Sequence, residues 1–368
     1  MYAKNKKSIY LIIHPCYGKT GTTWMQTHIL PQTSILNLAK GGGLEGEKFI
    51  SESLKKNQYS IFSPISYLDD ISIRYKNSWS MIISYCDLLY QKLFESLEEN
   101  KNENDLIAVL SDETILGYGG IEINSGLLLS IINTLESKFR KISIDIYFTI
   151  NITIREQISF LKSHFCYDFN IIKKQHSNFT KFIQGGIENI EFDIFGQINY
   201  WESYLFLRSL IPKSHQINLI PYELIASEPH LFLKKYFKSV PITNQIHSEI
   251  KNIEVRKKVN YNKSISGKNR IRDYTLLFGL FKSISQKSFR LTKDFRKANP
   301  YWESKLIKYY QLLKRRNIFR ELTYTELELT KKDLKILDEL KLYYSDSNQY
   351  LGQLIPENQL VKFNYISK

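Results

Sequence analysis

The sequence has little cysteine and no long apolar run, and each shortage excludes a class of protein. Its three cysteines, Cys16, Cys86 and Cys166, lie far apart and form no Cys-x-x-Cys pair, which argues against a zinc cluster and fits a reducing compartment. No apolar run approaches the roughly 18 residues that a membrane-spanning helix needs. Internal repeats, low-complexity segments and linkers are also missing. We therefore expect a globular protein without membrane spans or structural zinc.

The first seven residues give little sign of a targeting signal. They are mostly polar or basic and lead directly into an apolar pattern at Ile9, so we expect no signal peptide. Together with the sparse cysteines, this favours a cytoplasmic location. A peripheral contact with an anionic membrane remains compatible with that expectation, because the chain is strongly basic.

Composition places the chain among globular proteins that have an acidic partner. Of its 368 residues, 43% are hydrophobic and 24% are charged, which is ordinary for one large folded domain or two small ones. The formal net charge of +14 predicts that the partner is a polyphosphorylated donor, a polyanionic acceptor, nucleic acid or an anionic membrane surface. Charge alone leaves these four open, so the choice depends on motifs.

The most informative stretch of the chain is residues 8–30. Residues 9–14 form a short apolar run, which is typical of a strand buried on both faces. A turn with two glycines and Lys19 follows, and Thr22 begins a predicted helix that Pro31 ends. The free N–H groups of a helix start and the positive charge of Lys19 both attract anions. The sequence therefore predicts an anion site in this turn.

The turn does not match the P-loop of nucleoside-triphosphate-binding proteins, which requires a glycine where this chain has Ile13. The six residues from Lys19 to Trp24 instead resemble, at every position, the 5′-phosphosulfate-binding loop of the sulfotransferases that use 3′-phosphoadenosine 5′-phosphosulfate (PAPS). The resemblance implies that Lys19 is catalytic, because it faces the leaving phosphate. The alternative is an ordinary turn and helix cap. The donor-binding residues that the resemblance implies here are Gly18, Lys19, Thr20, Gly21, Thr22, Thr23 and Trp24.

A second match follows the third predicted strand. The sulfotransferases bind the 3′-phosphate of the donor with an arginine just after this strand and a serine eight positions later. Arg155 and Ser163 have this spacing, and Gln157 and Phe165 match bacterial members of the family. The chemistry agrees, because a guanidinium can donate two hydrogen bonds to a phosphate and a serine hydroxyl one more. The alternative for Arg155 is a solvated residue at a helix start.

Two further segments resemble the family more weakly. The segment from Tyr222 is similar to the Tyr-Glu-x-Leu pattern of these enzymes, which implies that the rings of Tyr222 and Trp24 neighbour the adenine. Core packing is the alternative for both rings. The basic stretch 257–264 corresponds to a family region that contacts the 3′-phosphate, and we assign Lys257 there. The stretch lacks the Arg-Lys-Gly run of the animal cytosolic enzymes.

The acceptor must lose a proton during the reaction, which calls for a general base near the donor. Residues 106–110 form a second apolar strand, and Glu113 follows its polar end, where open α/β sheets place their chemistry. We therefore predict Glu113 as the base, with helix capping as its alternative role. The other candidate bases are Asp112, Glu45, Glu47 and His28.

Apolar runs alternate with helical spacings along the chain, which predicts an α/β fold with a parallel sheet flanked by helices. Apolar residues recur at helical spacing from Ile83 and again from Leu127, and residues 167–189 are expected to form a variable loop. The resemblance implies a P-loop-like three-layer sandwich. We predict an α/β core at residues 1–265 and a helical C-terminal region at 266–368 that packs on it. The predicted strands are 9–14, 106–110, 142–150 and 217–220.

The motifs together predict a sulfotransferase that moves a sulfuryl group from PAPS to a hydroxyl or amine acceptor, such as a carbohydrate or glycolipid, and releases adenosine 3′,5′-bisphosphate. No metal is expected, because Lys19 and the loop amides face the leaving phosphate. The first alternative is a P-loop-type kinase of nucleotides or small molecules. The second is a basic, non-catalytic protein that binds nucleic acid or a membrane. A sulfotransferase would have no nucleic-acid partner, and the sequence identifies neither its acceptor nor its oligomeric state.

Overall fold

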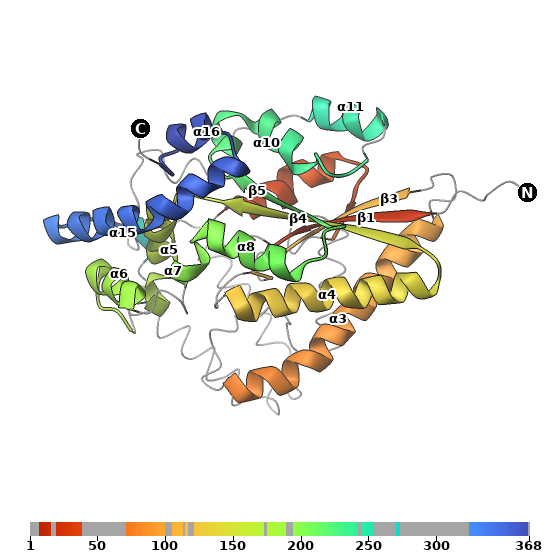
Figure 1. Ribbon diagram of the computed structural model, residues 1–368, viewed down its shortest axis with the longest axis horizontal. Coiled ribbons are helices and arrows are strands. Elements are labelled where there is room, and N and C mark those ends of the chain that lie inside the picture. The colour runs from red at the N-terminus through yellow and green to blue at the C-terminus, as the bar shows by residue number, and fades with distance from the viewer. Residues whose placement is uncertain are drawn as a thin grey trace, which may run out of the picture. The chain divides into compact units, whose positions relative to one another are not determined.

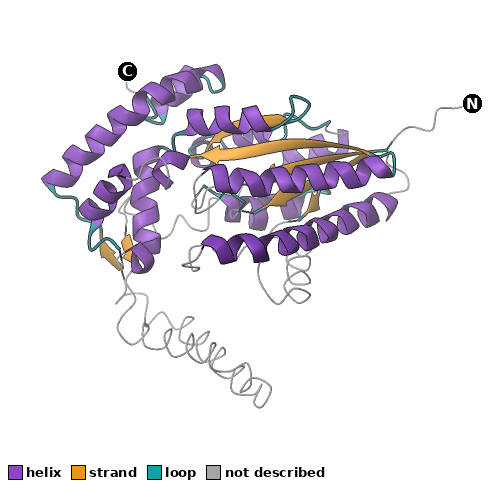
Figure 2. Ribbon diagram, turned by 60° about the horizontal axis from the view of Figure 1, so that its bottom comes forward, coloured by secondary structure: helices purple, strands orange, loops and turns teal. Residues whose placement is uncertain are grey.

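The described part of the chain is an α/β structure with a parallel five-stranded sheet and accompanying helices (Figure 1, Figure 2). The residues that the computed structural model describes are 7–15, 20–38, 71–99, 105–112, 115–116, 121–172, 175–188, 194–241, 244–253, 270–272 and 324–366. None of the helices within these ranges is both long and apolar enough to cross a membrane.

Two compact units make up the chain, and neither is continuous in sequence. The first unit contains residues 1–160, 186–261 and 338–368, and the second contains 161–185 and 262–337. The sequence, by contrast, predicts a division into two continuous segments, 1–265 and 266–368. Residues 338–368 belong to the same unit as the sheet, so side chains from this segment can contribute to a site built on the sheet.

The sheet has the strand order β2-β3-β1-β4-β5, with every pair parallel. All four predicted strands are confirmed, and β2 escapes sequence analysis because two residues give no pattern. Strand β4 begins three residues later than predicted, because the N–H groups of Ile142 and Ile144 both donate to the carbonyl of Phe139 in a turn where Ser143 has φ 58°. The strands are β1 Ser8–His14, β2 Leu36–Asn37, β3 Asp105–Ser111, β4 Asp145–Ile154 and β5 Gln216–Pro221.

The central strand β1 pairs on both sides along nearly its whole length. Its Ile13 lies opposite Leu110 of β3 and Ile150 of β4. Leu11, Ile12 and Ile13 are fully buried, and because successive side chains of a strand point to opposite faces, β1 is covered on both faces. The register therefore brings the carboxyl ends of β1 and β3 together at one edge of the sheet.

The chain changes direction across the sheet at β1. Strands β2 and β3 lie on one side of β1, and β4 and β5 lie on the other. In open α/β sheets, ligands bind outside the carboxyl ends of the strands at such a change of direction. The turn that follows β1 therefore starts where this class of fold holds its ligands.

Two long helices, α3 (Ile71–Glu99) and α4 (Ile121–Lys141), pack against each other (Figure 1, Figure 2). Leu89 and Leu93 of α3 and Leu128 of α4 are fully buried, in keeping with an apolar stripe at helical spacing. The other described α-helices are α1 Thr22–Trp24, α5 Gln157–Ile172, α6 Phe179–Glu188, α7 Ile194–Gln197, α8 Tyr200–Leu210, α9 Leu224–Ser227, α10 Pro229–Tyr236, α11 Asn244–Asn252, α15 Lys331–Tyr350 and α16 Glu357–Lys362.

Two predicted boundaries differ from the structure. Helix α3 begins at Ile71 rather than near Ile83, within a stretch whose apolar residues show no clear period. The helix predicted from Thr22 to Pro31 consists of three parts in the structure. The short α-helix Thr22–Trp24 is followed by a π-helical turn, Met25–Ile29, and then by a 3₁₀ turn, Leu30–Gln32, that contains the proline. Proline is tolerated near the start of such a turn, where its missing N–H has no partner to lose.

The prediction that residues 167–189 form a loop is wrong. Helix α5 continues to Ile172, and α6 covers most of the remainder. Phe165 packs against Phe179 and Phe182 with ring centroids 5.1 and 5.5 Å apart, so aromatic packing stabilises helices where the polar residues had indicated a loop. The C-terminal region, predicted as mostly helical, also contains an antiparallel strand pair, β6 (Arg270–Arg272) and β7 (Tyr324–Glu326).

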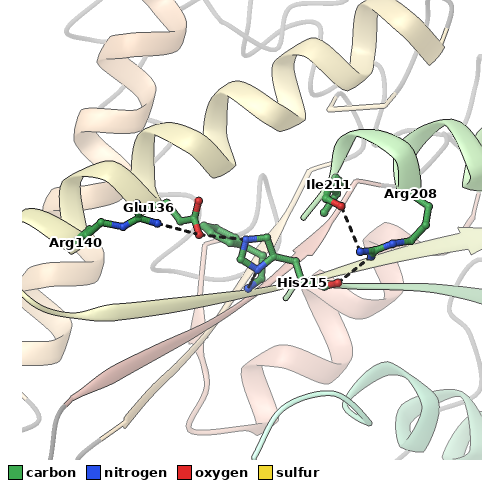
Figure 3. Close-up of polar contacts among 6 residues, drawn as sticks. Glu136, Arg140, Arg208, Ile211 and His215 are labelled. Carbon is green, nitrogen blue, oxygen red and sulfur yellow. Dashed lines mark hydrogen bonds and ion pairs between the residues drawn. The ribbon is translucent and has the colours of Figure 1, made fainter. Parts of the chain in front are cut away.

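A polar cluster joins α4, α8 and the start of β5 (Figure 3). His215 is buried, with its Nε2 3.4 Å from Oε1 of Glu136, and Arg208 donates to the carbonyls of His215 and Ile211 at 2.9 and 3.2 Å. Burial lowers the pKa of His215, while the neighbouring Glu136 acts in the opposite direction. The cluster precedes β5 and therefore lies at the amino end of that strand, away from the edge that carries the predicted site.

Two helical glycines provide a matched test of the packing. A Cβ atom on Gly186 of α6 would overlap the ring of Phe195, whereas a Cβ on Gly126 of α4 would meet nothing within 4 Å. We expect Gly186→Ala to lower the free energy of unfolding by about 1–3 kcal/mol and Gly126→Ala to raise it by about 0.5–1 kcal/mol. Urea unfolding of both variants measures this. Equal effects in the two variants would contradict the packing of α6 against Phe195.

Candidate functional site

The candidate site lies at the carboxyl edge of the sheet, where predicted residues from separate segments follow β1, β4 and β5. The structure describes Thr20 to Trp24 after β1, Arg155 after β4, and Tyr222 after β5. The predicted site residues outside the described ranges are Gly18, Lys19, Glu113 and Lys257, together with the alternative bases Glu45 and Glu47. For these six residues, the roles remain predictions from the sequence.

The end of the predicted loop lies against the segment that follows β5. Gly21 has φ 92°, a left-handed conformation that favours glycine, and its carbonyl accepts the N–H groups of Trp24 and Met25 at 2.9 and 3.2 Å. A Cβ on Gly21 would lie 2.5 Å from Cδ1 of Ile225 and 3.3 Å from the ring of Tyr222. Glycine is therefore required here both for its backbone conformation and for the close approach of Tyr222.

Arg155 lies over the ring of Tyr222, one of the two predicted aromatic residues of the site. Its guanidinium carbon is 5.1 Å from the ring centroid of Tyr222, within the range of a cation–π interaction. Nε and Nη2 of Arg155 donate to Oγ of Ser159 at 3.2 and 2.9 Å. The hydroxyl of Tyr200 donates to the Arg155 carbonyl at 2.6 Å, so backbone and side chain are both held. Gly21, Tyr222 and Arg155 thus form one continuous set of contacts.

The charge of Arg155 is only partly solvated. Burial lowers the pKa of its guanidinium, while the charge of Glu223 acts in the opposite direction. An arginine stays protonated at neutral pH even so. A desolvated cation interacts more strongly with an anion than a solvated one does, because the local dielectric constant is lower. Arg155 is therefore well suited to bind a phosphate.

Sequence reasoning missed the acidic residues beside Arg155. The two oxygens of Glu156 accept the N–H groups of Ile158 and Ser159 at 3.0 and 2.7 Å, which caps the start of α5. Glu223 accepts the N–H of Glu156 at 3.0 Å. Burial raises the pKa of Glu223, while the hydrogen bond from the Glu156 N–H and the charge of Arg155 oppose that rise. The only sequence signal for Glu223 is its place beside Tyr222 in the Tyr-Glu pattern.

Two further predicted donor-binding residues are described by the structure. Ser163 is half-buried on α5, in the part of that helix that belongs to the second unit, and the serine that contacts Arg155 directly is Ser159. Trp24 is 4% exposed, and its ring packs edge to face against Phe232 with centroids 6.0 Å apart. The Trp24 ring thus packs in the core, and the donor-binding roles of Trp24 and Ser163 stay predictions.

The hydroxyl of Thr22 is a further feature of the predicted loop. Thr22 is 3% exposed, and its Oγ1 has no hydrogen-bond partner among the described residues. A buried hydroxyl without a partner raises the free energy of the folded state, unless a bound group supplies the hydrogen bond. The resemblance had already assigned Thr22 to donor binding.

A buried polar network surrounds His14 at the end of β1. His14, the last residue of β1, places Nε2 2.9 Å from Oγ1 of Thr153 in β4 and Nδ1 3.1 Å from Oγ of Ser111 in β3. Gln26, which follows the loop, donates to the carbonyl of Ser111 at 2.8 Å. Burial lowers the pKa of His14 to about 3, so the imidazole is neutral. The network ties three strand ends to the helix that follows the loop.

The described alternative bases differ in exposure. Asp112 is 1% exposed, and its N–H donates to the carbonyl of His14 at 3.3 Å, which ties the end of β3 to β1. His28 is half-buried on the π-helical turn. Within the described ranges, no group of three or more histidine, cysteine, aspartate or glutamate side chains is placed to hold a metal ion.

Comparison with known proteins gives no relative for this chain. No family model, no curated protein and no solved structure matches it. The functional assignment therefore depends on the residues and their geometry alone.

The neutral His14 predicts how stability depends on pH. Its folded-state pKa of about 3 lies below the ordinary value of 6.5, so the unfolded chain binds the extra proton first as the pH falls. Stability from this group is complete above about pH 6.5 and is lost as the pH falls toward about 3. We expect the stability advantage of the wild type over His14→Gln to shrink by up to about 1.4 kcal/mol per pH unit below about pH 6.

Urea unfolding between pH 4 and 8 measures this advantage. His230→Gln, at an exposed histidine of α10, is the control for losing one imidazole. A difference between wild type and His14→Gln that stays constant across the pH range would show that His14 is not buried as a neutral side chain.

Proposed function

We propose that the protein is a PAPS-dependent sulfotransferase and that the carboxyl edge of its sheet binds the donor. The observation that carries the proposal is the contact set of Gly21, Tyr222 and Arg155. The resemblance assigned these three residues to one ligand from three separate segments, and in the folded chain they are neighbours. The position of the loop at the change of direction in the sheet supports the finer assignment of a P-loop-like fold.

The proposed roles follow the two ends of the donor. The loop from Gly18 to Thr23 binds the 5′-phosphosulfate, and the buried hydroxyl of Thr22 gains its missing hydrogen bond there. Lys19 stabilises the charge that develops on the leaving phosphate. Arg155 binds the 3′-phosphate, and Tyr222 orients the guanidinium through its ring.

The transfer needs a base from the protein, and otherwise mainly the positioning of donor and acceptor. The acceptor oxygen or nitrogen forms a bond to sulfur while the bond from sulfur to the 5′-phosphate oxygen breaks, which releases adenosine 3′,5′-bisphosphate. By analogy with phosphoryl transfer, positioning and electrostatics dominate such a step. We propose Glu113 as the group that takes the acceptor proton, because it directly follows Asp112, whose N–H fixes the end of β3 against β1.

The 3′-phosphate provides the sharpest test of the proposal. We expect the wild type to bind adenosine 3′,5′-bisphosphate more tightly than adenosine 5′-phosphate, and Arg155→Ala to lose about 10-fold to 100-fold of that preference, the value of one charge-assisted contact. Isothermal titration with the two nucleotides measures both affinities. Arg140→Ala, at an arginine whose side chain is 81% exposed on α4, is the control for losing one positive charge.

Two results would contradict the proposal. An Arg155→Ala variant with an undiminished preference would remove Arg155 from the 3′-phosphate site. Tight binding of ATP with magnesium, without any preference for a 3′-phosphate, would favour a kinase instead.

Lys19→Ala tests the other end of the donor. Because Lys19 is assigned to the 5′-phosphate, which both nucleotides carry, the variant should weaken the two by the same factor, about 10-fold or more. Its preference for the 3′-phosphate should stay at the wild-type value. The same titrations measure this. Loss of the 3′-phosphate preference in Lys19→Ala would show that the two ends of the donor are assigned the wrong way round.

A further inference from the structure

The C-terminal turn of the chain reaches the proposed 3′-phosphate site. Tyr365 follows α16 and is 2% exposed, and its hydroxyl donates to Oε2 of Glu223 at 3.0 Å. Both residues belong to the first unit. The resemblance to the sulfotransferases assigns no role to either of them.

Glu223 is held at both of its oxygens. Oε1 accepts the N–H of Glu156, the residue directly after Arg155, and Oε2 accepts the hydroxyl of Tyr365. The carboxylate also acts on Arg155 through its charge. Glu223 therefore links the C-terminal turn to the backbone next to Arg155 and to the guanidinium itself.

Tyr365 is in turn fixed from two directions. Nδ2 of Asn348 donates to the Tyr365 carbonyl at 2.8 Å, and the Tyr365 N–H donates to the carbonyl of Leu360 at 2.9 Å. Asn348 also exchanges two buried hydrogen bonds with Gln157, at 2.7 and 3.2 Å. Gln157 begins α5, two residues after Arg155. The contacts thus form a closed ring that starts and ends beside Arg155.

The backbone of Arg155 depends on the same turn. Tyr200, whose hydroxyl binds the Arg155 carbonyl, has its ring centroid 6.4 Å from that of Tyr365, in an edge-to-face arrangement. Tyr365 therefore contacts the residue that holds the backbone of Arg155 and the residue that balances its charge.

We propose that Tyr365 and Glu223 are positioning residues for Arg155, so that the C-terminal turn sets the preference for a 3′-phosphate; this rests on the proposed function. The physical reason is the orientation of the carboxylate. With the Tyr365 hydroxyl in place, Oε2 of Glu223 is engaged. Without that hydroxyl, Oε2 loses its donor and can turn toward the guanidinium, where it competes with a phosphate for the same N–H groups.

Tyr365→Phe tests the proposal with a minimal change, because it removes only the hydroxyl. We expect the ratio of the two affinities, for adenosine 3′,5′-bisphosphate against adenosine 5′-phosphate, to fall by about 5-fold, the value of one hydrogen bond. Tyr344→Phe is the matched control. Tyr344 is equally buried, and its hydroxyl donates to the carbonyl of Phe195 at 2.9 Å, so it loses a similar bond away from Arg155. Its ratio should equal that of the wild type.

The outcomes separate this inference from the proposed function. A wild type without preference for the 3′-phosphate overturns both. A wild type that has the preference, with Tyr365→Phe and Tyr344→Phe both matching it, overturns the inference and leaves the function standing. Should Tyr365→Phe fail to fold, Glu223→Gln takes its place; it keeps the shape and removes the charge that competes with the phosphate, so the ratio should rise above that of the wild type. A Glu223→Gln variant with the wild-type ratio would overturn the inference equally.

Discussion

The pairing of β1 with a strand on each side is the constraint on which the candidate site depends. Ile13 is held opposite Leu110 and Ile150, so the chain leaves β1 and β3 at the same edge of the sheet, and the longer β4 continues past it to Arg155. A register shift of one residue would separate His14 from Thr153 and Ser111. These buried hydrogen bonds therefore stabilise the register, and the register determines which residues can share a ligand.

Buried polar groups fix the positions of neighbouring strands more precisely than the apolar core can. An apolar interior tolerates small shifts between neighbouring strands, whereas hydrogen bonds in a low-dielectric interior have strict geometry and are costly to break. His14 contacts Thr153 and Ser111, and Gln26 contacts Ser111 again from beyond the loop. Two residues that flank the turn after β1 are thereby tied to the same residue of β3.

The sequence indicated the site where the signal is local. Strand β1 is an apolar run, and Arg155 and Tyr222 each follow a strand within a short pattern, so their places at the sheet edge could be predicted. The contact between Glu223 and Tyr365 could not, since it depends on which segments the fold brings together: the two residues lie 142 positions apart. The Ser159 contact with Arg155 is local, but it was missed because it depends on where α5 begins, after the cap by Glu156. Helix α6 was missed because its stabilising aromatic contacts reach back to α5.

In the proposed site, a carboxylate beside the arginine assigned to the 3′-phosphate needs a physical reason, since Glu223 attracts the cation that a phosphate would use. In the unliganded protein, burial of the Arg155 charge is costly unless opposite charges nearby compensate it. Glu223 supplies that compensation while both of its oxygens are engaged by Glu156 and Tyr365. A phosphate, with more charge and free oxygens, can then form the close hydrogen bonds that the engaged carboxylate does not. A ligand without a 3′-phosphate leaves the attraction between Arg155 and Glu223 intact, so a carboxylate that bound the guanidinium directly would reduce the preference for a 3′-phosphate. By engaging both oxygens of Glu223, the Glu156 N–H and the Tyr365 hydroxyl would therefore preserve the discrimination of the proposed site.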